Sequence, residues 1–205
     1  MRRLVLASLF VSAVAVAGPE APIIGGTDAT SGQYPNVVGV VIEAGDSVSL
    51  CTGTLNTNQW VMTAGHCVTP GAETGTSSQQ DLTDALIIYV NALEIFPNPP
   101  AGNAGIRAIA SMPDPMFDIN NLEAGHDRGI SELATLVPGI TPVALNFDES
   151  AAKPGRAVTQ VGYGDNDGQA DSGAGTLRTV GQSLVDCSAI GLQSSDNDRL
   201  LCYNQ

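Results

Sequence analysis

The feature that most constrains this chain is the pentapeptide Thr63-Ala64-Gly65-His66-Cys67, which directly follows the apolar run at 60–62. Cys51 lies sixteen positions before Cys67, a separation that a disulfide loop can close. A histidine beside a disulfide at the end of a strand has a restricted position. A general base needs such a restriction, because it must stay within hydrogen-bond reach of the proton that it removes. The pattern therefore makes His66 the first candidate for acid–base chemistry.

The N-terminus has the three parts of an export signal. Two arginines near the start supply positive charge, residues 4–14 are almost wholly apolar, and Ala15-Val16-Ala17 is a cleavage signal. The apolar stretch is too short to span a membrane, and the sequence contains no other candidate span. We therefore predict a signal peptide over residues 1–17, a short propeptide over residues 18–22, and a secreted or periplasmic protein.

Export changes how the four cysteines are interpreted. Disulfides persist in oxidising compartments, so an even number of cysteines in an exported chain predicts two disulfides. Four cysteines allow three pairings, and the pairing between sequence neighbours closes two short loops. Zinc is the competing interpretation, but neither a C-x-x-C pair nor an H-x-x-x-H spacing is present. The cysteines are Cys51, Cys67, Cys187 and Cys202.

A second place for a metal is the acidic stretch Asp165-Asn166-Asp167-Gly168. Its oxygens suit calcium, but the stretch matches only the start of the EF-hand spacing and lacks the closing glutamate of that motif. A solvated loop is the expected structure there, and the question of calcium is left open. We therefore assign no metal site and expect no cofactor.

The charge of the chain limits its partners. There are 21 acidic and 8 basic residues, which give a formal net charge of −13. A strongly acidic surface repels the phosphates of nucleic acids and anionic membranes. We therefore expect neither nucleic acid nor a membrane as a partner, and the sequence does not define an oligomeric state.

Short apolar and β-branched segments between turn residues predict a chain of many short strands. The 23 glycines and 12 prolines also favour turns over long helices. Residues 69–84 are polar and are expected to form a loop, and Pro138–Pro142 is expected to be a linker that divides the strands into two groups. Such strands are typical of antiparallel barrels or a sandwich. The expected strands are 37–42, 50–55, 60–63, 86–90, 106–112, 157–161, 177–185 and 200–203, with a further apolar element at 130–136.

Several segments together resemble the trypsin-like serine endopeptidases, the S1-type enzymes of the chymotrypsin fold. The pentapeptide at 63–67 is similar to the histidine motif of that family, and Asp127–Leu133 is similar to its aspartate motif. Ile23-Ile24-Gly25-Gly26 resembles its mature N-terminus, and Gly162-Tyr163-Gly164 resembles the end of an early strand of its second barrel. The resemblance covers residues 23–205 in the order that the family has.

The resemblance implies an all-β fold of two antiparallel six-stranded barrels, of which the second is incomplete here. The first barrel would comprise residues of about 23–137, and the partial second barrel residues of about 138–205. The resemblance also implies the disulfides Cys51–Cys67 and Cys187–Cys202, because these pairs fall where the family has two common disulfides.

For the site, the resemblance implies that His66 is the general base and that Asp127 holds the other ring nitrogen of His66. Arg128 stands where the family usually has an aliphatic residue, so the aspartate motif is imperfect. The second histidine, His126, is expected to be a surface loop residue. Two nearby acidic alternatives lack the aliphatic pattern of the motif: Asp114 and Asp118.

The resemblance also gives a role to Ile23. Cleavage before this residue would free an α-amino group, which in the family pairs with the aspartate beside the catalytic serine and orders the oxyanion hole. Pro22 differs from the arginine or lysine of a tryptic activation site. The sequence therefore leaves open which protease would activate the chain.

The nucleophile of the family lies in a Gly-Asp-Ser-Gly-Gly motif after the second matched cysteine, and no such motif occurs in these 205 residues. Gly45-Asp46-Ser47 precedes His66, which is the wrong side in the family's order. Ser172 has similar neighbours but lies in a turn-rich segment, which is poorly suited to hold a nucleophile in place. We therefore expect a sequence that is truncated before its catalytic serine.

Two functions are compatible with these observations. The first is a serine endopeptidase that acts on protein or peptide substrates through an acyl-enzyme, with this chain inactive because the nucleophile segment is absent. The alternative is a non-catalytic, protease-fold binding protein. Whether the chain is an enzyme, and which substrates its family chemistry would select, is not determined by these residues.

Overall fold

Strands dominate the computed structural model, which describes residues 26–97, 99–121, 124–166, 173–193, 196 and 201–203. The strands are β1 (Thr27–Asp28), β2 (Val37–Ala44), β3 (Ser47–Leu55), β4 (Trp60–Thr63), β5 (Leu86–Val90), β6 (Ile106–Pro113), β7 (Gly129–Leu133), β8 (Ala157–Gly162), β9 (Arg178–Val185) and β10 (Cys202–Tyr203). The helical elements are α2 (Gln79–Ala85) and the short 3-10 turns η1 (His66–Val68), η3 (Glu149–Ala152) and η4 (Cys187–Ile190). The predicted all-β fold is confirmed: one antiparallel barrel is closed, and a second sheet is incomplete.

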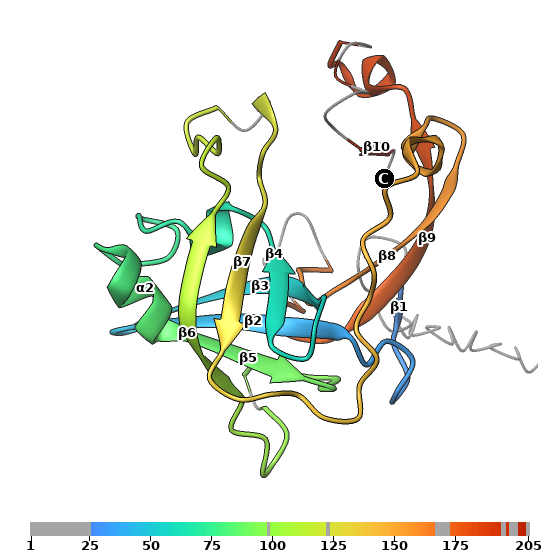
Figure 1. Cartoon of the computed structure of the whole chain (residues 1–205). Coiled ribbons are helices and arrows are strands. Elements are labelled where there is room, and N and C mark those ends of the chain that lie inside the picture. Colours follow the sequence, from blue (N-terminus) through green and yellow to red (C-terminus); the bar gives the residue numbers. More distant parts are fainter. Residues whose placement is uncertain are drawn as a thin grey trace, which may run out of the picture.

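The closed barrel has the strand order β2-β3-β4-β7-β6-β5, and every neighbouring pair is antiparallel (Figure 1). Most of β2 is buried on both faces. Val38, Val40 and Ile42 face the barrel interior, whereas Val41 packs in a second cluster with Tyr163. Alternation along a strand sends successive side chains to opposite faces, so a strand covered on both faces reads as a continuous apolar run.

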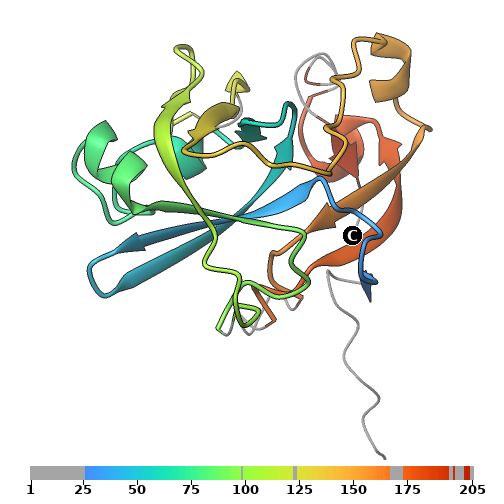
Figure 2. The ribbon, with the colours of Figure 1, turned by 60° about the horizontal axis from the view of Figure 1, so that its bottom comes forward.

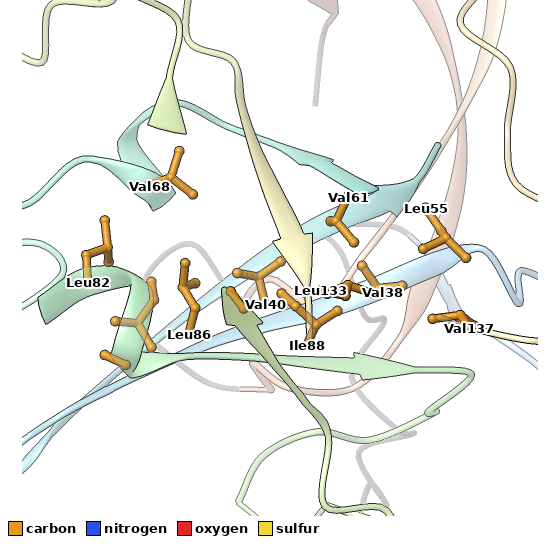
Figure 3. Close-up of a cluster of buried hydrophobic side chains, with 13 residues drawn as sticks. Val38, Val40, Leu55, Val61, Val68, Leu82, Leu86, Ile88, Leu133 and Val137 are labelled. Carbon is orange, nitrogen blue, oxygen red and sulfur yellow. The ribbon is translucent and has the colours of Figure 1, made fainter. Parts of the chain in front are cut away.

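Branched apolar side chains from all around the barrel fill its interior (Figure 3). Several of them are completely buried, including Leu55, Val61 and Leu133. Close packing of such side chains supplies most of the stability of a small β-domain. The labelled members in the figure are Val38, Val40, Leu55, Val61, Val68, Leu82, Leu86, Ile88, Leu133 and Val137.

The second sheet is built around β9. One edge of β9 pairs with β8 over Arg178–Ser183. The other edge pairs with β1 at one end of β9 and with β10 at the other end (Figure 1). The short strand β1 therefore belongs to this sheet although it precedes the barrel in sequence. Arg178 fixes it there: the buried guanidinium donates to Asp28 Oδ1 at 3.2 Å and to the Gly173 carbonyl.

The expectation of a loop over the whole of 69–84 was wrong, because α2 begins at Gln79. The Ser78 hydroxyl accepts a hydrogen bond from the Asp81 backbone N–H at 3.1 Å and caps the helix. Only one side of this seven-residue helix is buried, so its few apolar residues show no clear period in the sequence. Figure 2 shows α2 on the side of the barrel away from the second sheet.

Of the two sequence segments that resemble a nucleophile motif, the structure describes one. Ser47 is the first residue of β3 and pairs with Ala44, so Gly45 and Asp46 form a two-residue hairpin turn. Ser172 lies outside the described residues.

Candidate active site

His66 and Asp127 come together because their strands are neighbours. His66 follows the end of β4, Asp127 precedes the start of β7, and Thr63 of β4 pairs with Gly129 of β7. Asp127 Oδ2 lies 2.9 Å from His66 Nδ1, and Asp127 Oδ1 accepts a hydrogen bond from the His66 backbone N–H at 2.8 Å. One carboxylate therefore holds both the ring and the backbone of the histidine.

This geometry decides which ring nitrogen can act as a base. An ionised carboxylate only accepts hydrogen bonds, so His66 Nδ1 carries the proton in the neutral ring. The other nitrogen, Nε2, then has a lone pair that can take a proton. In the described residues the ring of His66 has no hydrogen-bond partner other than Asp127, and its side chain is 40% exposed. A substrate or a nucleophile could therefore reach Nε2.

A glycine allows the close approach of the two elements. Gly129 lies two residues after Asp127 and is the first residue of β7. A Cβ atom at Gly129 would lie 2.2 Å from Val68 Cγ2 and 3.3 Å from the Ala64 carbonyl oxygen. Because η1 lies directly against this position, any larger residue would separate Asp127 from His66.

We predict that Gly129→Ala destabilises the protein by roughly 1–3 kcal/mol, the usual cost of overpacking a core. It should also weaken the contact between His66 and Asp127, because Val68 is buried and cannot move aside freely. Urea denaturation measures the first effect, and the ¹⁵N shifts of the His66 ring measure the second. Gly181→Ala is the matched control, since a Cβ at this exposed strand position meets no atom within 4 Å. Equal effects of the two substitutions would contradict the close-approach argument.

The four cysteines form two disulfides, Cys51–Cys67 and Cys187–Cys202. This is the pairing that the resemblance implied. The first disulfide ties η1 to β3, so the turn that begins with His66 is held by a covalent bond as well as by Asp127. The two disulfides join cysteines that are 16 and 15 positions apart in the sequence. In the chain-entropy model, each disulfide of this kind stabilises the folded protein by about 3 kcal/mol.

The disulfide also bears on metal binding. Cys51, Cys67 and His66 offer ligand atoms within 4.8 Å of one another, and they form the single such group of three in the part of the chain that the structure describes. Zinc binds thiolates, and both sulfur atoms are used in the disulfide. The group is therefore no metal site in the oxidised protein. The acidic stretch at 165–168 lies partly outside the described residues.

The structure separates the three aspartates that the sequence left as alternatives. Asp127 contacts His66, whereas Asp114 binds Arg128 at 2.6 Å and Asp118 accepts the Asn120 backbone N–H at 2.9 Å. The ion pair of Arg128 was not expected from sequence. Ile23 lies outside the described residues, so the structure places neither the mature N-terminus nor its partner.

A histidine whose ring is oriented by an aspartate at the end of a barrel strand is the arrangement that a serine protease requires of its acid–base residues. The family model for trypsin matches this chain over residues 23–205. The chain therefore belongs to the trypsin family, whose proteases act on protein or peptide substrates. The resemblance that the sequence motifs indicated is confirmed at the level of the family.

Two further observations concern the setting of the protein. The trypsin-like domain with its two disulfides fits an extracellular protein. Within the described ranges, every helix is too short or too polar to cross a membrane.

Proposed function

We propose that His66 and Asp127 are the acid–base residues of a serine endopeptidase site that hydrolyses peptide bonds through an acyl-enzyme. The observation that carries this proposal is the double contact of Asp127 with the ring and backbone of His66. His66 Nε2 would take the proton of a serine hydroxyl and later give it to the leaving amine. Asp127 would keep the proton on Nδ1 and stabilise the imidazolium that forms.

We further propose that these 205 residues do not catalyse the reaction alone. The Gly-Asp-Ser-Gly-Gly motif is absent from them, and the oxyanion-hole donors of the family belong to the same segment. Nucleophile and oxyanion hole carry most of the rate enhancement in acyl transfer. The absent motif would also suit a non-catalytic binding protein, but such a protein would have no need of an oriented general base.

The proposal also includes the export of the chain and the removal of its N-terminal residues. Residues 1–17 would be the signal peptide, residues 18–22 the propeptide, and Ile23 the mature N-terminus of a secreted or periplasmic protein. The domain would consist of a first barrel over about 23–137 and a partial second barrel over about 138–205. The two disulfides support the export part of this proposal, because they persist in oxidising compartments.

A serine-directed fluorophosphonate probe and a fluorogenic peptide library test the activity. We expect the chain of 205 residues to give neither labelling nor cleavage. A chimera that continues the chain with the nucleophile segment of an active family member should be labelled, and His66→Ala should abolish this labelling. A folded chimera without labelling would show that His66 does not serve a serine.

The same assay covers the remaining serine candidate. Labelling of the unextended chain that disappears in Ser172→Ala would identify Ser172 as the nucleophile and would overturn the proposal that the chain is inactive. Labelling that survives both Ser172→Ala and His66→Ala would come from a contaminant or a non-specific reaction.

A further inference from the structure

The antiparallel pairing of β6 and β7 continues for one residue pair beyond the end of β6 at Pro113 and the start of β7 at Gly129. The last pair in register is Pro113 with Gly129, so Asp114 and Arg128 stand opposite each other at the next position. The Asp114 backbone N–H donates to the Arg128 carbonyl at 2.7 Å. Side chains directly opposite each other on antiparallel strands share one face of the sheet, so these two side chains meet.

The carboxylate of Asp114 reaches both residues that flank Asp127. Its Oδ2 accepts a hydrogen bond from Arg128 Nε at 2.6 Å and lies 3.7 Å from His126 Nδ1. Its Oδ1 accepts the Met116 backbone N–H at 2.8 Å. The pKa of Asp114 lies below its usual range. The main cause is the hydrogen bond from the Met116 N–H, and the next is the hydrogen bond from the Arg128 guanidinium. The Asp114 side chain is only 12% exposed, whereas that of Arg128 is 63% exposed.

The backbone around Asp127 needs external support. The Arg128 N–H donates to the His126 carbonyl at 2.7 Å, which closes a three-residue turn centred on Asp127. His126 has a φ of 65°, in the left-handed region that residues other than glycine rarely adopt, and Gly125 before it has a φ of 78°. Such a backbone persists only where surrounding contacts hold it. Asp114 binds Arg128 on one side of Asp127, and the Arg128 guanidinium in turn lies 3.4 Å from His126 Nδ1 on the other side.

Asp114 and Arg128 make their contacts apart from the contact between Asp127 and His66. Arg128 binds Asp114 and its side chain is 63% exposed, whereas the Asp127 carboxylate contacts His66, the first residue of η1. Asp114 and Arg128 therefore act on Asp127 through the backbone. No hydrogen bond links Asp114 or Arg128 to His66 in the described residues.

We propose that Asp114 and Arg128 are positioning residues, which hold Asp127 where its carboxylate binds both His66 N–H groups. The proposal rests on the proposed function, in which Asp127 orients His66. A hydrogen bond of this kind tolerates only a few tenths of an ångström and weakens steeply when it bends. Relaxation of the turn at His126 would therefore release the imidazole of His66 even though the fold stays intact.

Long-range ¹H–¹⁵N NMR of the two ring nitrogens tests the proposal, because it reports which nitrogen of a neutral histidine carries the proton. The chain has only two histidines, and His66→Gln assigns the signals because it removes one of the two sets. In the unsubstituted chain we expect His66 mainly as the Nδ1–H form. In Asp114→Ala and in Arg128→Ala we expect a shift to the Nε2–H form that free imidazole side chains favour. The double variant should add nothing further, since both residues act as one unit.

Two matched controls separate positioning from general destabilisation. Asp148→Ala removes an aspartate that, like Asp114, accepts a hydrogen bond from the backbone N–H two residues later in the chain. Asp148 is the N-cap residue of η3 and does not lie beside Asp127. Arg107→Ala removes an arginine near the far end of β6, whose guanidinium donates to the Asp84 carbonyl at 3.0 Å. Both controls should leave His66 in the Nδ1–H form.

The outcomes distinguish this inference from the proposed function. If His66 stays in the Nδ1–H form in folded Asp114→Ala and Arg128→Ala, the positioning role is wrong and the proposed function is untouched. If the unsubstituted chain lacks the Nδ1–H form, the contact with Asp127 does not exist in solution and both proposals fail. Should Asp114→Ala not fold, Arg128→Ala decides, because its side chain is largely exposed.

Discussion

Replacement of Tyr163 by alanine is expected to lower the free energy of unfolding by about 3–5 kcal/mol, the range for removal of a large buried aromatic side chain. Tyr163 follows β8 and is 1% exposed. It packs in the cluster that joins the barrel to the second sheet, against apolar side chains of both parts. Its hydroxyl donates to the Ala92 carbonyl at 2.6 Å, and its backbone N–H donates to Thr52 Oγ1 at 3.0 Å. The substitution should therefore loosen the second sheet from the barrel.

Urea denaturation followed by circular dichroism and by tyrosine fluorescence measures this loss. Tyr163→Phe is the matched variant, because it keeps the ring and removes only the hydroxyl. It leaves the Ala92 carbonyl without its donor and should cost about 1–3 kcal/mol. A loss of less than 1 kcal/mol in Tyr163→Ala would mean that the second sheet does not depend on this contact.

The second large effect is expected in the barrel itself. Leu133→Ala should lower the free energy of unfolding by about 2–5 kcal/mol, because it leaves a cavity among rigid neighbours. Leu133 is completely buried and ends β7, the strand that begins two residues after Asp127. Loss of packing at this position should thus also weaken the strand that carries the site.

Leu136→Ala is the control for Leu133→Ala. The two leucines are three residues apart, but the side chain of Leu136 is 63% exposed and leaves no cavity when it is removed. Its loss should change the stability by no more than about 0.5 kcal/mol. Equal losses in the two variants, measured by thermal unfolding, would contradict the assignment of the barrel interior.

Much of the strand pattern could be predicted because it depends on local composition. The strands at Trp60–Thr63 and Leu86–Val90 lie where they were expected, since both are short runs of apolar residues bounded by polar ones. The strand β1 and helix α2 were missed. Thr27–Asp28 is too short to show a pattern, and its pairing with β9 joins residues about 150 positions apart. In α2 the buried side is too narrow to show a helical period.

The sequence by itself determined the family, the positions of the barrel strands and the histidine beside a cysteine. These features are encoded in short segments, whose residue types act over a few neighbouring positions. The resemblance already implied that Asp127 meets His66, whereas only the tertiary structure showed that the carboxylate contacts both the ring and the backbone of His66, and which residue Asp114 binds. His66 and Asp127 are 61 positions apart, and their contact depends on the pairing of β4 with β7 and on the left-handed turn at His126. Such contacts follow from strand register and backbone direction, which no local run of residues specifies.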